Sequence, residues 1–372
     1  MLRRAAGLLL TLGLAACGDG DPQGASTASG RVLILGLDGT RSEGIELAQT
    51  PNLDALRASG YVDLDAITGD VSLSGPGWAS MLSGVWCDKH KVVDNDVSWA
   101  NSHFDAYPHF LARAEQARPA LRTASVVHWA PINDEILCAD ERADDCGGVD
   151  QVVTRDTDEG VRDAVVGLLR EGDPEAVFVQ FDDIDHAGHG TAPSSPPGGF
   201  CPKPSAELDG NCILRGLNDE YLAEIERIDG YVGNILVALR ERPRYAQENW
   251  LILVSPDHGG GGQVFNQHGF NVAQDRRTFL IVAGPAARPL PGTPVTRLAD
   301  LPSGDGNGLP PTDPSGAKLV DVAATALFHL GIAIDPTWQI EGQPVGVVGA
   351  PAYEEREIPT CYAATSFTPD AR

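Results

Sequence analysis

Basic residues are scarce in this chain. Its 372 residues include 27 Lys and Arg against 52 Asp and Glu, which gives a formal net charge of −25 at pH 7. No basic cluster interrupts this acidic composition. Binding a nucleic-acid polymer requires many phosphates to be neutralised by Lys and Arg, so that function class is excluded. An acidic surface also slows the approach of a small anion unless bound cations reverse the local field, which is a first hint of metal ions.

Long apolar runs are missing beyond the amino terminus. Residues 5–16 form an apolar run behind Arg3 and Arg4 that is too short to span a bilayer as a mature helix. The run ends in Leu14-Ala15-Ala16-Cys17, which resembles a bacterial lipobox. We expect residues 1–17 to be a lipoprotein signal peptide, with cleavage before Cys17 and lipidation of that residue. An ordinary signal peptide with a cysteine near its cleavage site is the alternative.

This amino terminus predicts an exported protein, held by lipid on the bacterial cell envelope and facing the periplasm or the cell surface. Residues 18–30 are rich in Gly, Ser, Asp and Ala, which is typical of a flexible tether.

No Cys-x-x-Cys pair occurs, so a zinc site built from thiolates is not expected. Apart from Cys17, six cysteines remain, and an even number in an oxidising compartment favours disulfides over buried free thiols. Pairs Cys138–Cys146 and Cys201–Cys212 would close short loops, leaving Cys87 with Cys361. Six cysteines allow 15 connectivities, so other pairings remain open.

Short apolar runs alternate with helical patterns along the rest of the chain, which predicts an α/β domain with a mainly parallel sheet. We expect this single domain to cover residues 31–350 and to be followed by a tail over 351–372. The expected strands are Val32–Leu37, Ala124–His128, Ala176–Phe181, Trp250–Val254 and Phe279–Ala283. The expected helices are 50–60, with Thr50 as N-cap, 217–240, capped by Asn218 or Asp219, and 318–330. Residues 191–216 and 286–316 read as long loops.

Carboxylates and imidazoles follow several of these strands, where an α/β sheet places its site. Asp38 ends the first strand, and Asp257 and His258 follow the strand at 250–254. Asp185 and His189 follow the strand at 176–181. His268 comes ten residues after His258. Carboxylate and imidazole together suit zinc, while Mn²⁺ or Fe tolerate the same ligands.

A nucleophile is suggested by the segment that begins at Ser72. Pro76 predicts a helix start, which places Ser74 at a helix N-terminus where the dipole and free N–H groups favour a negative oxygen. Ser74 could instead simply cap the helix, and Ser72 is the nearest competitor for the nucleophilic role.

The chain contains Ser74-x-Pro76, Ser80, Gly84, Asp88-Lys89-His90 and Asn95, together with the motif Asp185-x-x-Gly188-His189. In these residues it resembles bacterial type I phosphodiesterases/nucleotide pyrophosphatases of the alkaline phosphatase superfamily. The resemblance implies an alkaline-phosphatase-like three-layer fold with a mainly parallel central sheet flanked by helices. It also implies two divalent metal ions, expected to be zinc. One would be held by Asp38, Ser74, Asp257 and His258, and the other by Asp185, His189 and His268. Ser74 would be the nucleophile, and Asn95 would donate to a phosphate oxygen. Asp182 and His186 share the spacing of Asp185 and His189 and are the alternative register.

The expected function is therefore a hydrolase that cleaves phosphodiester or pyrophosphate bonds of small, nucleotide-like molecules through a phosphoserine. Alternatives are a phosphomonoesterase, for which Arg41 or Arg155 would have to clamp the phosphate, and a sulfatase or phosphonate hydrolase of the same superfamily. Sulfatases of the superfamily carry Arg at the position of Trp78, which argues against that activity. Trp78, Trp86 and Trp99 could wall a leaving-group pocket or simply pack. A metal-binding surface lipoprotein without activity is the contrasting class.

Overall fold

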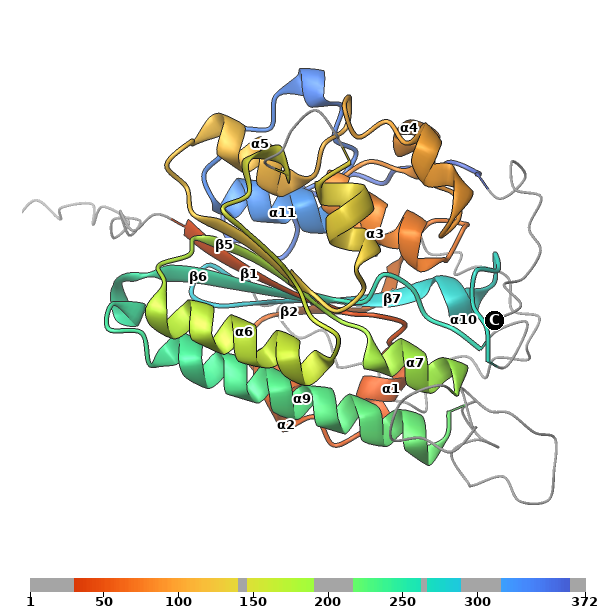
Figure 1. The fold of residues 1–372 in the computed structure, drawn as a ribbon, viewed down its shortest axis with the longest axis horizontal. Coiled ribbons are helices and arrows are strands. Elements are labelled where there is room, and N and C mark those ends of the chain that lie inside the picture. The colour runs from red at the N-terminus through yellow and green to blue at the C-terminus, as the bar shows by residue number, and fades with distance from the viewer. Residues whose placement is uncertain (1–29, 140–145, 191–216, 262–265, 289–315, 362–372) are drawn as a thin grey trace, which may run out of the picture.

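A seven-stranded sheet forms the centre of the protein (Figure 1). The computed structural model describes residues 30–139, 146–190, 217–261, 266–288 and 316–361. Within these residues the strand order is β2-β7-β6-β1-β5-β3-β4. The strands are β1 (Gly30–Leu37), β2 (Tyr61–Ile67), β3 (Thr123–Val127), β4 (Gln151–Thr154), β5 (Ala176–Phe181), β6 (Asn249–Ser255) and β7 (Arg277–Ala283).

The sheet is mainly parallel, as the sequence predicts. Strands β6, β1, β5, β3 and β4 run parallel, whereas β7 is antiparallel to both β6 and β2. All five expected strands are present, and β1 begins at Gly30, the last residue assigned to the tether. Strands β2 and β4 are missing from the prediction. Both are edge strands with exposed polar residues, such as Asp65 in β2 and Gln151 in β4, so they lack the apolar runs of a buried strand.

Helices cover both faces of the sheet (Figure 1). One face carries α3 (Ser74–Ser83), α4 (Cys87–His90), α5 (Phe110–Ala117) and α11 (Asp321–His329). The other carries α1 (Ser42–Leu47), α2 (Pro51–Ser59), α6 (Asp158–Glu171), α7 (Asp183–His189) and α9 (Asp219–Arg240). The remaining short elements are α10 (Ala273–Arg276), η1 (Val97–Asn101), η2 (Ile132–Leu137), η3 (Cys146–Gly148), η4 (Tyr245–Gln247) and η6 (Pro336–Trp338). The three-layer α/β architecture is thus confirmed.

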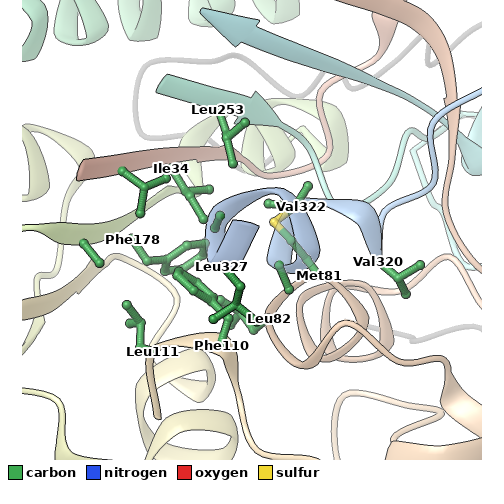
Figure 2. Close-up of a cluster of buried hydrophobic side chains, with 14 of the residues drawn as sticks. Ile34, Met81, Leu82, Phe110, Leu111, Phe178, Leu253, Val320, Val322 and Leu327 are labelled. Carbon is green, nitrogen blue, oxygen red and sulfur yellow. The ribbon is translucent and has the colours of Figure 1, made fainter. Parts of the chain in front are cut away.

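Two apolar cores hold these layers together, because alternate residues of a strand point to opposite faces. In β1, Val32 and Ile34 face α3, α5 and α11, while Leu33 and Leu35 face α6 and α9. Figure 2 shows the first core, where Ile34 and Phe178 of the sheet meet Leu82 and other side chains of the covering helices. Each strand at the centre of the sheet is therefore buried on both sides and held rigidly.

The helix ends differ partly from expectation. Asn218 caps α9 as predicted, since its Oδ1 accepts a hydrogen bond from Tyr221 N at 2.8 Å. Thr50 precedes α2, but its side chain accepts no cap hydrogen bond, and its hydroxyl donates to Ile45 O. Helix α11 begins at Asp321, three residues later than predicted. None of the described helices is both long and apolar enough to cross a membrane.

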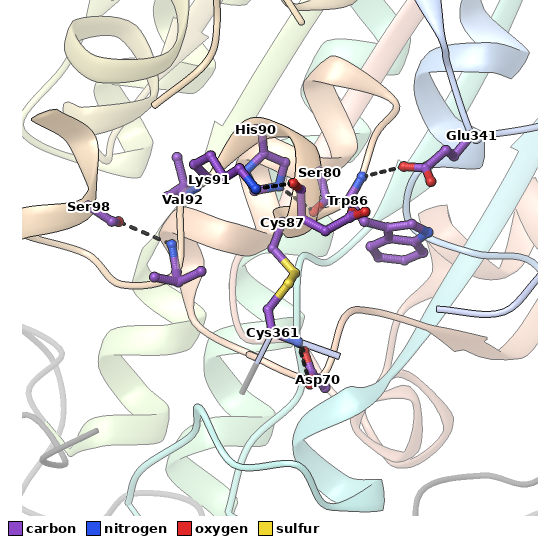
Figure 3. Close-up of a disulfide and its surroundings, with 12 residues drawn as sticks. Asp70, Ser80, Trp86, Cys87, His90, Lys91, Val92, Ser98, Glu341 and Cys361 are labelled. Atoms are coloured by element: carbon purple, nitrogen blue, oxygen red, sulfur yellow. Dashed lines mark hydrogen bonds between the residues drawn. A yellow bond between two sulfur atoms is a disulfide. The ribbon is translucent and has the colours of Figure 1, made fainter. Parts of the chain in front are cut away.

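Two of the expected disulfides are present. Cys138 pairs with Cys146, and Cys87 pairs with Cys361 (Figure 3). The second bond fastens the carboxyl-terminal segment to α4, and both oxygens of Asp70 accept a hydrogen bond from Cys361 N at 2.9–3.0 Å. Cys201, Cys212 and Cys17 lie outside the described residues, so the third pairing and the lipidation site stay predictions.

Candidate active site

Three neighbouring strands deliver most of the candidate ligands. In the sheet β1 lies between β6 and β5, all three parallel, so their carboxyl ends meet at one edge. Asp38 follows β1, Asp257 and His258 follow β6, and α7, which carries Asp185 and His189, follows β5. The alternation of strand and helix predicted this convergence.

A first group consists of Asp38, Asp257, His258 and Ser74, all buried. His258 Nε2 lies 3.5 Å from Asp38 Oδ1 and 3.4 Å from Asp257 Oδ2. Ser74 Oγ lies 3.2 Å from the same nitrogen. One ligand atom each from Asp38, Asp257 and His258 lies within 4.8 Å of the others, which is compact enough for one ion.

A second group consists of Asp185, His189 and His268. His189 Nε2 lies 3.2 Å from Asp185 Oδ2 and 3.0 Å from His268 Nε2. His268 Nε2 lies 3.7 Å from Asp185 Oδ1. The His258 and His268 rings stack with their centroids 3.8 Å apart, so the two groups adjoin each other. The structure therefore brings together every residue that the sequence assigned to metal binding.

Glycine allows the two groups to approach. Gly39, directly after Asp38, has φ +59°, in the left-handed region that favours glycine. A Cβ at this position would also lie 2.4 Å from Asp185 Oδ1. Any larger residue at Gly39 would therefore force the loop after β1 away from α7.

The donor set fits divalent cations. Asp38 Oδ1, Asp257 Oδ2 and Asp185 Oδ1 are buried oxygens without a hydrogen-bond partner, and a buried unpaired acceptor is costly. Burial, together with the charge of Asp257, raises the pKa of Asp38 well above its usual range. Burial and the charge of Asp185 also raise the pKa of Asp257 to about 6, although His258 opposes them. Divalent ions would satisfy these oxygens and keep both carboxylates ionised.

In the second group, histidines rather than carboxylates surround the acidic ligand. Burial favours the neutral form of Asp185, but the nearby His189 and His268 outweigh it and hold the pKa of Asp185 far below its usual range. The charge of Asp185 raises the pKa of His189 to about 9 despite partial burial. A cation would replace the proton on His189 as the partner of this carboxylate.

The two candidate nucleophiles have different surroundings. Ser74 is the first residue of α3, and its hydroxyl faces His258. The hydroxyl of Ser72 is buried and donates to Phe270 O at 2.9 Å. Asn95 lies beside Ser74, because its Oδ1 accepts from Gly75 N at 2.7 Å. The Asn95 amide nitrogen is thereby turned away from Gly75.

The other residues named for the site are Trp78, Trp86, Trp99 and Arg41. Trp78 and Trp86 are buried in the core and do not wall a pocket. Trp99 is partly exposed, packs at 6.3 Å against Trp129, and would lie 3.0 Å from a Cβ on Gly75. Arg41 is buried and donates to Glu43 and Gly260 O.

The alternative register borders the site, because Gln180 Nε2 donates at 3.0 Å both to Asp182 Oδ1 and to Asp38 Oδ2. Asp182 and His186 form an ion pair at 3.1 Å, and the His186 ring packs against His128 rather than against His258 or His268. Arg155 is exposed and donates to Thr154 O.

The sequence does not predict the roles of Asp158 and His128 beside the site. Asp158 accepts hydrogen bonds from the backbone N of Asp182 and Asp183, both at 3.0 Å, and lies 2.8 Å from His128 Nδ1. It thereby fixes the start of α7. His128 carries no spacing signal, and Asp158 reads as an ordinary first-turn acid of α6, so no local pattern reveals their link.

Comparisons with known proteins agree with this geometry. A family model described as type I phosphodiesterase / nucleotide pyrophosphatase matches residues 32–277. No curated protein matches the chain in sequence.

Three solved structures illustrate the fold. A phosphonate monoester hydrolase from Silicibacter pomeroyi has a TM-score of 0.56 at 15% identity, over 88% of this chain and 78% of its own. Murine ectonucleotide pyrophosphatase / phosphodiesterase 5, also solved as an inactive variant with AMP, has a TM-score of 0.54 at 12% identity. The match covers 82% of this chain and 96% of the murine chain. A 2-O GAG sulfatase has a TM-score of 0.57 at 14% identity, and the match covers 88% of this chain and 76% of the sulfatase chain.

Proposed function

The chain belongs to the type I phosphodiesterase / nucleotide pyrophosphatase family and is a hydrolase of phosphoric esters; from this we propose that it cleaves phosphodiester or pyrophosphate bonds of small, nucleotide-like molecules. The observation that carries the proposal is the position of the Ser74 hydroxyl. It lies at the N-terminus of α3, 3.2 Å from His258 Nε2. His258 in turn lies within reach of a shared ion both with Asp38 and Asp257 and with Asp185 and His268.

We propose that Asp38, Ser74, Asp257 and His258 hold one divalent ion and that Asp185, His189 and His268 hold another, with zinc as the metal. Carboxylate and imidazole ligands at these positions support zinc. When bound, such ions lower the pKa of the nucleophile and stabilise charge on the leaving oxygen.

The chain's own residues then carry a double displacement. Ser74 Oγ attacks phosphorus in line, a Ser74–phosphorus bond forms, and the bond to the leaving oxygen breaks. The serine proton leaves to solvent and the leaving oxygen takes up a proton. The amide nitrogen of Asn95, held by the contact between its Oδ1 and Gly75 N, donates to a phosphate oxygen. Water then hydrolyses the phosphoserine and frees Ser74.

Aromatic side chains support a diester with an organic group. Trp99 and Trp129, both partly exposed, lie together on the Gly75 side of the nucleophile and can contact a flat base. For a monoester the dianionic phosphate needs a cationic clamp, and Arg41 is already engaged by Glu43 and Gly260.

The decisive experiment compares kcat/KM for p-nitrophenyl phosphate with kcat/KM for a nucleotide p-nitrophenyl diester. It uses the zinc-saturated domain from residue 18 onward. We expect a preference for the diester. A preference for the monoester would overturn the diesterase proposal and favour the phosphomonoesterase alternative.

We also propose that the protein is lipid-anchored through Cys17 on the cell envelope. The two disulfides support an oxidising compartment. Replacement Cys17→Ser should move the protein from the membrane fraction to the soluble fraction, and unchanged membrane association would contradict the anchor.

A further inference from the structure

The two carboxylate oxygens of Asp38 have different surroundings. Oδ2 accepts two hydrogen bonds, from Trp78 Nε1 at 2.9 Å and from Gln180 Nε2 at 3.0 Å. Oδ1 accepts none and lies 3.5 Å from His258 Nε2. We propose that Trp78 and Gln180 are positioning residues that occupy Oδ2 and thereby commit Oδ1 to the metal ion. The inference rests on the proposed function, because it assigns Asp38 to a metal site.

Trp78 connects the nucleophile's helix to this ligand. It lies four residues after Ser74 on α3, so the two side chains share one face of the helix. Its ring crosses below β1 and packs edge-on against Phe178 at 5.8 Å. Gly36 makes room for it, since a Cβ there would lie 2.5 Å from the indole. A single rigid side chain therefore sets the position of Asp38 relative to Ser74.

Gln180 holds the carboxylate from the neighbouring strand. It is fully buried in β5, opposite Gly36 of β1. Its Oε1 accepts hydrogen bonds from the backbone N of His128 at 3.1 Å and of Trp129 at 2.9 Å. These donors fix the orientation of the amide, because a flipped amide would turn its NH₂ group toward two N–H groups. The Gln180 NH₂ must therefore face the carboxylates, and its nitrogen donates both to Asp38 Oδ2 and to Asp182 Oδ1, each at 3.0 Å.

Two fully buried donors on one oxygen prevent rotation of the carboxylate about its χ2 bond. Partners of this kind orient a metal ligand, and their loss typically costs about 10- to 100-fold in metal affinity. The position of Trp78 in the sequence also gains an explanation. Where sulfatases of the superfamily carry Arg, this chain carries a tryptophan that donates to the ligand Asp38.

The test measures zinc affinity directly, by competition with a chromophoric chelator, for Trp78→Phe and Trp86→Phe. Both replacements keep an aromatic ring and remove an indole from the same core. Trp86 lies beside the Cys87–Cys361 disulfide (Figure 3), and its backbone N donates to Glu341 Oε2 at 2.9 Å. We expect Trp78→Phe to weaken zinc binding about 10-fold or more, and Trp86→Phe to leave it within about twofold of wild type, since Trp86 is no partner of a ligand.

The Tm of each zinc-free variant separates positioning from folding. Equal Tm losses with unequal zinc affinities support the inference, and equal zinc affinities overturn it. If Trp78→Phe does not fold, Gln180→Met serves as the second variant, and wild-type zinc affinity in that variant overturns the inference as well. Failure of the wild type to bind zinc would instead refute the proposed metal site itself.

Discussion

Ser72 and Ser74 are two residues apart, yet only one of their hydroxyls faces the ligand groups. Ser72 Oγ donates to Phe270 O, whereas Ser74 Oγ approaches His258. Helix α3 begins at Ser74, directly after Ser72 and Leu73. The Ser72 hydroxyl therefore stabilises the surrounding fold, whereas the Ser74 hydroxyl faces the site. The spacing to Pro76 favours Ser74 over Ser72 in the sequence, and in the structure only the Ser74 hydroxyl approaches His258.

Replacement of these serines should give opposite results. Ser74→Ala should retain less than about a tenth of wild-type diester hydrolysis, because the covalent step loses its nucleophile. Ser72→Ala should keep the activity and lower the free energy of unfolding by about 1 kcal/mol, the usual contribution of one hydrogen bond. Rates and urea unfolding check both. Activity above about a tenth in Ser74→Ala would refute the phosphoserine.

His90 offers a test of stability against pH. It is fully buried, accepts from Val92 N at 3.1 Å through Nδ1 and lies 3.0 Å from Ser80 Oγ through Nε2. Burial lowers the pKa of His90 from 6.5 to about 3. The unfolded chain therefore binds a proton that the folded protein refuses, and stability falls as pH drops below 6.5 toward 3.

Between pH 7 and pH 5 this residue should remove about 2 kcal/mol from the free energy of unfolding. The variant His90→Gln should lack that part of the pH dependence, although it is less stable at pH 7. His103→Gln, which replaces an exposed histidine, is the control and should retain it. Urea unfolding at both pH values gives the comparison, and identical slopes for all three proteins would refute the assignment.

At the scale of elements, the seven residues of α7 carry two candidate ligands and depend on a neighbour for their placement. Asp158, at the start of α6, accepts from the first backbone N–H groups of this segment. Such groups have no partner inside their own helix, so an external acceptor fixes where the helix begins. The position of Asp185 and His189 is therefore set partly from α6.

Replacing Asp158 by Asn should disturb both stability and metal binding. The amide offers one acceptor oxygen, so one buried N–H of α7 loses its partner at a cost of about 1–3 kcal/mol. We expect bound zinc per chain to fall below the wild-type value, measured by elemental analysis after dialysis. Asp163→Asn, at an exposed carboxylate of the same helix α6, should leave both quantities unchanged. Full zinc content in Asp158→Asn would show that α7 is placed without it.

The elements that the sequence predicts best are those with a repeated physical signal. Buried strands such as β1, β5 and β6 have continuous apolar runs, and the ligands follow them directly. The edge strands β2 and β4 lack that signal. The contact between Trp78 and Asp38 is unpredictable for another reason. It depends on how α3 crosses β1, a tertiary arrangement that no local spacing encodes.

At the scale of the whole molecule, the Cys87–Cys361 disulfide closes the largest described loop, across 274 residues. Around it, Val71 and Leu73 pack against the two cysteines, directly before Ser74. The carboxyl-terminal segment is further fixed by Tyr353, whose hydroxyl donates to Asp321 at 2.9 Å. The described part of the tail, residues 351–361, thus supports the domain near the nucleophile.

Removing this disulfide with the pair Cys87→Ser and Cys361→Ser should lower the free energy of unfolding by about 2–5 kcal/mol. Removing Cys138–Cys146, with a sequence separation of 8, should cost less, because a short loop restricts the unfolded chain less. Denaturant unfolding of the two double variants tests the order. A larger loss from the short loop would show that native contacts outweigh chain entropy here.

The order of strands in the sheet determines when each strand can pair while the chain is being synthesised. Strand β1 is synthesised before every other described strand, yet both of its neighbours come much later, at 176–181 and 249–255. Until residue 255 has been synthesised, one edge of β1 has no strand to pair with. The disulfide between Cys87 and Cys361 forms later still, because Cys361 is synthesised near the end of the chain. Contacts between such distant residues form slowly, and exposed strand edges invite aggregation meanwhile. In a growing chain, β1 therefore keeps an unpaired edge until β6 has been made, and the Cys87–Cys361 bond can form only after residue 361.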